Sequence, residues 1–147
     1  MNILILAVGK SKTEYYEPAI SSYLKRLNKW VKLSWRFIPA SNKAQETAQL
    51  IGALPHMAHV VLLDERGQSC STQQLADEIE SLQNASTKTV VFVIGGAYGV
   101  AEAMHQQANQ VIKLSDLIFP HELVRLILTE QIYRAYDINH GGKYHHV

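Results

Sequence analysis

The chain has 147 residues, of which 47% are hydrophobic and 18% are charged, a composition typical of one globular domain with a real core. The single cysteine, Cys70, excludes an internal disulfide framework and favours a reducing compartment. No apolar run approaches the roughly 18 residues of a membrane span, and the apolar start Ile3–Val8 is too short for a signal peptide. We therefore expect a cytoplasmic, non-membrane protein with a single domain, residues 1–147.

The net charge of +1 conceals an uneven distribution along the chain. Residues 1–43 hold eight basic and two acidic residues, whereas the remainder holds six basic and eleven acidic residues. Such asymmetry is typical of a face that binds a polyanion. A helix surface that is simply solvated explains the same charges, so both interpretations stay open at this point.

Strand and helix patterns alternate along the whole chain. In order they predict strand Asn2–Val8, helix Thr13–Lys29, strand Leu33–Ile38, helix Asn42–Ala53, strand His59–Leu63, helix Ser71–Leu82, strand Thr89–Ile94, helix Ala101–Ala108, strand Gln110–Lys113 and helix His121–Ile138. Thr13 is the expected N-cap of the first helix, and Pro120 suits the first turn of the last one. The run Thr89–Ile94 lacks alternation, which favours a strand buried on both faces.

This alternation predicts an α/β fold, a parallel sheet with helices on both faces. Ligands of such sheets bind beyond the carboxyl ends of the strands. Three unusual loops are expected there: the charged turn Asp64–Gly67, the glycine-rich Gly95–Gly99 and the irregular Leu114–Pro120. Their convergence is the strongest physical indication of a site.

The last predicted helix is apolar over more than one stripe. Leu123, Leu126 and Tyr133 widen its apolar face, so we expect it to be covered on more than one side. Polar side chains embedded in this surface need partners. They either form structural pairs or belong to a site, and they are Arg125, Glu130, Gln131 and Arg134.

Several familiar motifs are absent or weak. GGAYG is neither the dinucleotide fingerprint nor a P-loop, and a tight turn explains Gly99 better than the pair Gly95-Gly96. The tail histidines have no neighbouring cysteine or carboxylate, so we expect no metal. Cys70 has no signature of a nucleophile. The lysine, tyrosine and histidines of the tail suit contact with a nucleotide through phosphate and stacking.

Taken together, four segments are far more specific than any one of them. LLDERG (62–67), VFVIGGAYG (91–99), LSDLIFPHELVRLILTEQIYRA (114–135) and YHH (144–146) closely resemble the ribosomal RNA large subunit methyltransferase H family of the SPOUT superfamily. The resemblance runs from Met1 to His146. It implies a trefoil knot at the C-terminal end of the parallel sheet, a rare topology that periodicity alone does not indicate.

The resemblance also implies a cofactor and the segments that hold it. Members of the family bind S-adenosylmethionine in the knot, largely through backbone groups. Carried over, the expected cofactor-binding residues are Leu63, Gly95, Gly96, Leu114, Ser115, Asp116, Leu117, Ile118, Phe119 and Pro120.

The reaction implied by the resemblance is methylation of N3 of a pseudouridine in 23S ribosomal RNA, on the large subunit or the 70S ribosome, by a homodimer that shares its active sites. Arg134 would orient the base or stabilise its anionic form, and Tyr144 and His145 would contact it, with His145 a candidate proton acceptor. A structural ion pair for Arg134, and a tail that is disordered without RNA, are the alternatives. The expected RNA-binding residues are Lys25, Arg26, Lys29 and Lys143, the last replacing a proline common in the family.

Two other classes of function remain at this point. One is a non-catalytic RNA-binding protein that kept the knot, and the other is a flavodoxin-like domain that binds a small nucleotide. Calorimetry with S-adenosylmethionine separates the flavodoxin-like domain from a methyltransferase. Methyl transfer to unmodified ribosomes separates the non-catalytic RNA-binding protein from a methyltransferase.

Overall fold

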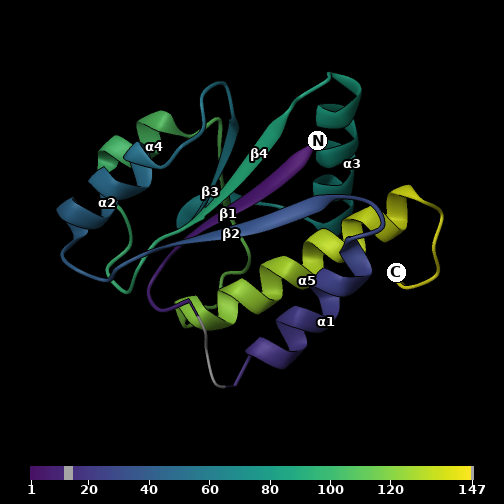
Figure 1. Cartoon of the computed structure of the whole chain (residues 1–147), viewed down its shortest axis with the longest axis horizontal. Coiled ribbons are helices and arrows are strands. Elements are labelled where there is room, and N and C mark those ends of the chain that lie inside the picture. The colour runs from purple at the N-terminus through teal and green to yellow at the C-terminus, as the bar shows by residue number, and fades with distance from the viewer. Residues whose placement is uncertain (12–14, 147) are drawn as a thin grey trace.

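The sheet has five parallel strands in the order β2-β1-β4-β3-β5, in a computed structural model that describes residues 1–11 and 15–146. Figure 1 shows α1, α3 and α5 on one face of the sheet and α2 and α4 on the other. The predicted α/β class and the two helical layers are confirmed. The elements are β1 (Asn2–Val8), α1 (Glu17–Leu27), β2 (Lys32–Ile38), α2 (Lys43–Gly52), β3 (His59–Ser69), α3 (Thr72–Asn84), β4 (Thr89–Ile94), α4 (Glu102–Gln107), β5 (Gln110–Lys113) and α5 (His121–Asn139).

Two apolar cores lie on the two sides of the sheet. Along β1, Ile3 and Ile5 point into the core beneath α1, α3 and α5, whereas Leu6 and Val8 point into the core beneath α2 and α4. Strand β4 contributes Phe92 to the first core, and the residues directly before and after Phe92 belong to the second core. The uninterrupted apolar run of β4 therefore marks a strand covered on both faces, as predicted.

Two predicted boundaries differ most from the structure. Helix α1 begins at Glu17, with Pro18 in its first turn; Thr13 lies outside the described residues. The predicted turn Asp64–Gly67 is instead an irregularity inside β3, because the pairing with β5 jumps from Leu63 to Gln68. Glycine is required there: a Cβ on Gly67 would lie 2.7 Å from backbone atoms of β5.

Helix α5 crosses the first core and begins after Pro120, as predicted. Its Arg125 is only 2% exposed and donates hydrogen bonds to the carbonyl oxygens of Val8 (3.0 Å) and Lys10 (2.7 Å). Gly9 between them has φ +120, and a Cβ there would lie 2.9 Å from Arg125 Nη2. Arg125 is thus a structural residue that holds the end of β1 against α5. No helix in residues 1–11 and 15–146 has the length and apolar character needed to cross a membrane.

Tyr133, one of the residues that widen the apolar face of α5, is covered by its own chain. It is 8% exposed and packs against Tyr23, Trp30 and Tyr144. Most of the partly exposed apolar residues of α5 lie near its start. They are Leu123, Val124, Leu126 and Ile127, with Ile138 alone near its end.

Candidate functional site

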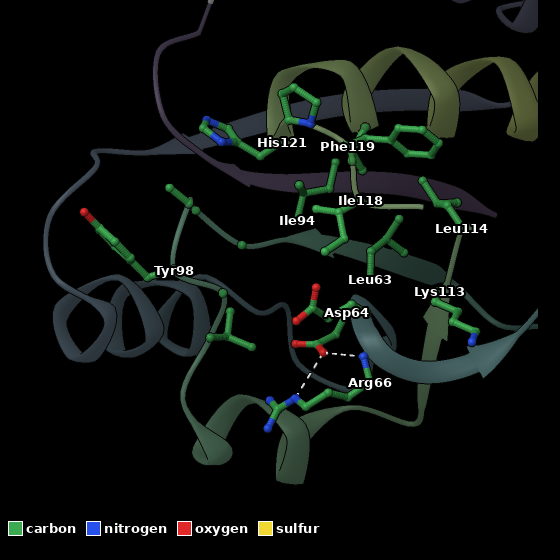
Figure 2. A pocket seen from close by; sticks show the side chains of 18 of the residues that line it. Leu63, Asp64, Arg66, Ile94, Tyr98, Lys113, Leu114, Ile118, Phe119 and His121 are labelled. Atoms are coloured by element: carbon green, nitrogen blue, oxygen red, sulfur yellow. Dashed lines mark hydrogen bonds and ion pairs between the residues drawn. The ribbon is translucent and has the colours of Figure 1, made fainter. Parts of the chain in front are cut away.

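The carboxyl ends of β3, β4 and β5 open into a cavity of about 890 Å³, drawn in Figure 2. Its walls are the irregular segment of β3, the Gly95–Gly99 loop and the Leu114–Pro120 loop, with the start of α5 alongside. The predicted convergence of these three segments is confirmed. Apolar side chains dominate one wall, with Leu63, Ile94 and Ile118 close together in the figure.

The Gly95–Gly99 loop owes its glycines to three different contacts. Gly99 has φ +75 and donates its N–H to the Gly96 carbonyl (3.0 Å), which closes a tight turn. A Cβ on Gly95 would lie 2.9 Å from the side chain of Val100. One on Gly96 would lie 2.7 Å from Oε1 of Glu46. Close packing thus accounts for the adjacent pair that a turn alone leaves unexplained.

Helix α2 holds this loop from behind, which sequence reasoning did not find. Thr47 Oγ1 accepts a hydrogen bond from the backbone N–H of Ala101 (2.9 Å), just before α4 begins. Glu46 lies beside Gly96, and both α2 side chains are only 3% exposed. The sequence contains no signal of this contact, because it shows a glutamate followed by a threonine but not that both are buried.

The Leu114–Pro120 loop presents both polar and apolar groups to the cavity. Ser115 Oγ accepts the N–H of Leu117 (3.0 Å), and Leu117 and Ile118 are 72% and 81% exposed. Asp116 instead points to solvent, paired with Lys113. Of the ten predicted cofactor residues, nine line the cavity and Asp116 does not.

A charged cluster lies at one side of the cavity, between the irregular segment of β3 and α4. Asp64 Oδ1 accepts hydrogen bonds from the backbone N–H (2.8 Å) and Nε (3.2 Å) of Arg66, while Oδ2 lies 3.4 Å from His105 Nε2 on α4. Burial alone would raise the pKa of Asp64, but the hydrogen bonds and charge of Arg66, helped by His105, hold that pKa below 3.8. The carboxylate thus fixes the irregular segment of β3 against α4.

The predicted catalytic residues form a second cluster, on the distal half of α5. Glu130 Oε1 accepts from Arg134 Nε (2.9 Å) and from the Tyr144 hydroxyl (3.0 Å), and Arg134 Nη1 lies 3.2 Å from His145 Nδ1. The Arg134 guanidinium also lies 4.6 Å from the Tyr144 ring centroid. Burial, followed by the hydrogen bonds to Tyr23 and Glu130, raises the pKa of Tyr144, so its hydroxyl stays protonated.

The tail that carries this cluster is folded onto the helices rather than extended. Asp137 anchors it, accepting the backbone N–H of Tyr144 at Oδ2 (3.0 Å) and that of Gly142 at its carbonyl (2.8 Å). The Tyr144 hydroxyl lies 3.1 Å from the Tyr23 hydroxyl on α1. The structure describes the tail as far as His146; Val147 lies outside the described part.

The predicted RNA-binding residues lie beside this second cluster. The Arg26 guanidinium is 5.7 Å from the ring centroid of Tyr133, and Lys29 Nζ is 4.3 Å from that of Trp30. Lys25 and Lys143 are exposed. Cations therefore flank Arg134 and His145 on the same end of the molecule.

The two clusters are well separated within one chain. The cavity reaches α5 at His121 and Val124, whereas Arg134 lies ten residues beyond Val124, roughly 15 Å along the helix axis. The structure thus brings Arg134, Tyr144 and His145 together, but not with the predicted cofactor loops.

The family model described as predicted SPOUT methyltransferase matches residues 1–145. The chain belongs to the SPOUT methyltransferase family. Two similar curated proteins are the ribosomal RNA large subunit methyltransferases H of Latilactobacillus sakei, 35% identical, and Bacteroides thetaiotaomicron, 36% identical, each alignment covering 99% of both chains. The fold of this SPOUT methyltransferase is also that of a "probable methyltransferase" from Bordetella pertussis Tohama I, with a TM-score of 0.53, 10% identity and coverage of 91% of this chain and 95% of that one.

Proposed function

We propose that this SPOUT methyltransferase transfers a methyl group from S-adenosylmethionine to N3 of a pseudouridine in 23S ribosomal RNA, as a homodimer in the cytoplasm, acting on the large subunit or the 70S ribosome. The name shared by relatives that match over nearly the full chain supports ribosomal RNA as the substrate. The observation that carries the proposal is the cavity built from the three loops at the carboxyl edge of the sheet.

The residues around the cavity fit this cofactor. Its volume of about 890 Å³ lies in the range of small-molecule sites. Leu63, Leu114 and Phe119 provide an apolar surface for adenine, and the two loops offer backbone donors and acceptors for ribose and the amino acid. Bound there, the sulfonium supplies an already activated methyl group.

The second cluster fits the needs of the target base. Arg134 is a fixed cation, whose hydrogen bond to Glu130 raises its pKa, and it would stabilise negative charge developing on the base. Arginine can only donate, so its contact with His145 makes Nδ1 an acceptor and leaves the proton on Nε2.

Homodimerisation would bring the two separated clusters together. One half-exposed face of α5 carries apolar residues near its start and charged residues further along, in the order Leu123, Leu126, Ile127, Glu130 and Arg134. Two such helices packed antiparallel across a two-fold axis would place Arg134 of one chain over the cavity of the other. The roughly 15 Å separation within one chain supports such a shared site.

A trefoil knot is part of the same proposal. The loops Gly95–Gly99 and Leu114–Pro120 meet at one cavity, and α5 returns from β5 at the sheet edge to pack against α1 and α3. Both features support a threaded C-terminal segment. Pulling the chain by its two ends in an optical trap should yield an extended length shorter than that of an unknotted chain of equal size.

The test of function uses ribosomes isolated from cells that lack this modification. With labelled S-adenosylmethionine, the enzyme should transfer one methyl group per ribosome, mapped by mass spectrometry to N3 of a pseudouridine. Cofactor binding without transfer would favour the RNA-binding protein that lost activity. Absence of cofactor binding in calorimetry would overturn the proposal.

A further inference from the structure

Helix α2 carries a buried carboxylate that the chemistry above does not use. Glu46 is 3% exposed, and its Oε2 accepts the backbone N–H of Ser41 (2.7 Å). Its other oxygen, Oε1, is buried and finds no hydrogen-bond partner in residues 1–11 and 15–146. A buried acceptor left in this way is costly, so its position calls for an explanation.

Oε1 lies directly behind the cofactor loop. A Cβ on Gly96 would be 2.7 Å from it, and Gly96 itself lines the cavity. Glycine here lets a negative charge approach the cavity more closely than any other residue would allow.

Other acidic groups near the cavity are paired with cations or exposed to solvent, as Glu65 is. Asp64 is paired with Arg66, and Asp116 with Lys113. No ion pair within 4.0 Å joins Glu46 to a cation in the described parts of the chain, although Lys43, one turn earlier on α2, lines the cavity. The start of α2 contributes a favourable helix dipole, which Glu46 shares as a first-turn residue.

An unpaired buried charge acts strongly on a neighbouring ligand, because little solvent screens it. Substrate and product of the proposed reaction differ in this respect. S-adenosylmethionine carries a positive sulfonium, whereas S-adenosylhomocysteine, left after the methyl group departs, has a neutral thioether at the same sulfur. The adenosine and amino acid parts of the two molecules are the same.

We propose that Glu46 is a specificity-determining residue, whose carboxylate behind Gly96 favours the sulfonium substrate over the thioether product. This inference rests on the proposed function. It gives the buried oxygen a role in turnover, since a field that favours the substrate helps new substrate to replace bound product.

Thr47 provides the matched control. It lies next to Glu46, is equally buried and holds the same loop through its hydrogen bond from Ala101, but it carries no charge. Thr47→Val should therefore disturb the loop without changing the field. If Glu46 were only a mechanical support, both variants would affect the two ligands in the same way.

The experiment is calorimetry of S-adenosylmethionine and S-adenosylhomocysteine with the wild type, Glu46→Gln and Thr47→Val. For Glu46→Gln we expect the substrate to bind about five- to tenfold more weakly and the product to change by less than about twofold. Thr47→Val should weaken both ligands by a similar factor. Glu46→Met, also uncharged and of similar length, repeats the test should the glutamine variant fold poorly.

An unchanged ratio of the two affinities in the uncharged Glu46 variants would overturn the inference and leave the methyltransferase proposal intact. A wild-type protein that binds neither ligand would remove both. Circular dichroism of each variant confirms that loss of binding does not reflect loss of fold.

Discussion

Individual charged residues were easier to locate from the sequence than their partners. The run Asp64-Glu65-Arg66-Gly67 marks a polar segment after a buried strand, and its position at the cavity follows from the parallel sheet. The contact of Arg66 with His105 spans 39 residues of chain, so no local pattern indicates it. Glu46 was missed for the same reason, because its importance depends on what folds over it.

Asp64→Asn should reveal how much the charged cluster stabilises the fold. The Asp64 pKa is lowered in the folded state, so the carboxylate contributes stability above its ordinary value of 3.8 and loses it as the pH falls through the lower folded value. At pH 7 the variant should be less stable by about 1 kcal/mol, a modest figure because Arg66 is exposed to solvent. Urea unfolding between pH 7 and pH 3 measures this difference.

The matched control is Asp116→Asn, which removes a carboxylate from a solvent-exposed pair with Lys113. Its effect on unfolding should be smaller at every pH. A difference between Asp64→Asn and the wild type that persists unchanged into acid would contradict the linkage argument.

At the scale of whole elements, the sequence predicted strands better than the ends of helices. The bounds of β4 and β5 agree with the structure, because buried parallel strands read as short apolar runs with clear breaks. Strand β3 continues to Ser69, since pairing with β5 overrides the charged segment in its middle. The sequence predicted that the surface carrying Tyr133 is covered, but not that the tail covers it, because the tail has no hydrophobic periodicity.

The basic residues of α1 and the segment just after it should bind RNA phosphates. Replacing Lys25, Arg26 and Lys29 with glutamine should weaken RNA binding for all sequences and lower the slope of log affinity against log salt by about 2. Filter binding at several salt concentrations measures the slope. Cofactor affinity should not change, because the three residues lie away from the cavity.

Lys88→Gln, an exposed lysine in the turn before β4, is the control for a change of charge elsewhere. It should leave the salt slope of RNA binding as it is. If the triple variant keeps the full slope, the basic segment is a solvated surface, the alternative that composition left open.

The folded tail should act in methyl transfer rather than in binding. Deletion of the tail would uncover Tyr133 and leave Asp137 without its backbone partners, so point variants are cleaner. Tyr144→Phe combined with His145→Ala keeps the ring packing and should lower kcat by at least about 100-fold. His146→Ala, on the adjacent exposed residue, is the control, and single-turnover methylation is the measurement. Near-normal turnover of the double variant would place the chemistry on Arg134 alone.

At the scale of the whole molecule, the hydrophobic periodicity predicted the layers of helices and sheet but carries no information on the oligomeric state. Alternating strands and helices are enough to indicate the covered parallel sheet. They contain no information on whether the C-terminal segment is threaded through a loop, because threading depends on the path of the chain in space. The partly exposed start of α5 supports the proposed dimer, and the distance between the cavity and Arg134 defines what the partner chain would have to supply.

A shared active site makes a prediction that a site within one chain cannot meet. Ala97→Trp, on an exposed position of the cavity wall, should block cofactor binding, and Arg134→Ala should remove the cation near the base. Each variant should be inactive as a homodimer. Co-refolded in equal amounts, they should regain roughly a quarter of wild-type activity, since half of the dimers are mixed and each mixed dimer has one intact site.

The intact site in the mixed dimer would combine the cavity of the Arg134→Ala chain with the Arg134 cluster of the Ala97→Trp chain. If both parts of a site came from one chain, no chain in the mixture would hold a complete set, and activity would stay at the level of the separate variants. Sedimentation of the mixture establishes that dimers have formed, which makes a missing recovery interpretable. Recovered methyl transfer would therefore place Arg134 opposite the partner's cofactor cavity, as the proposed antiparallel packing of two α5 helices requires.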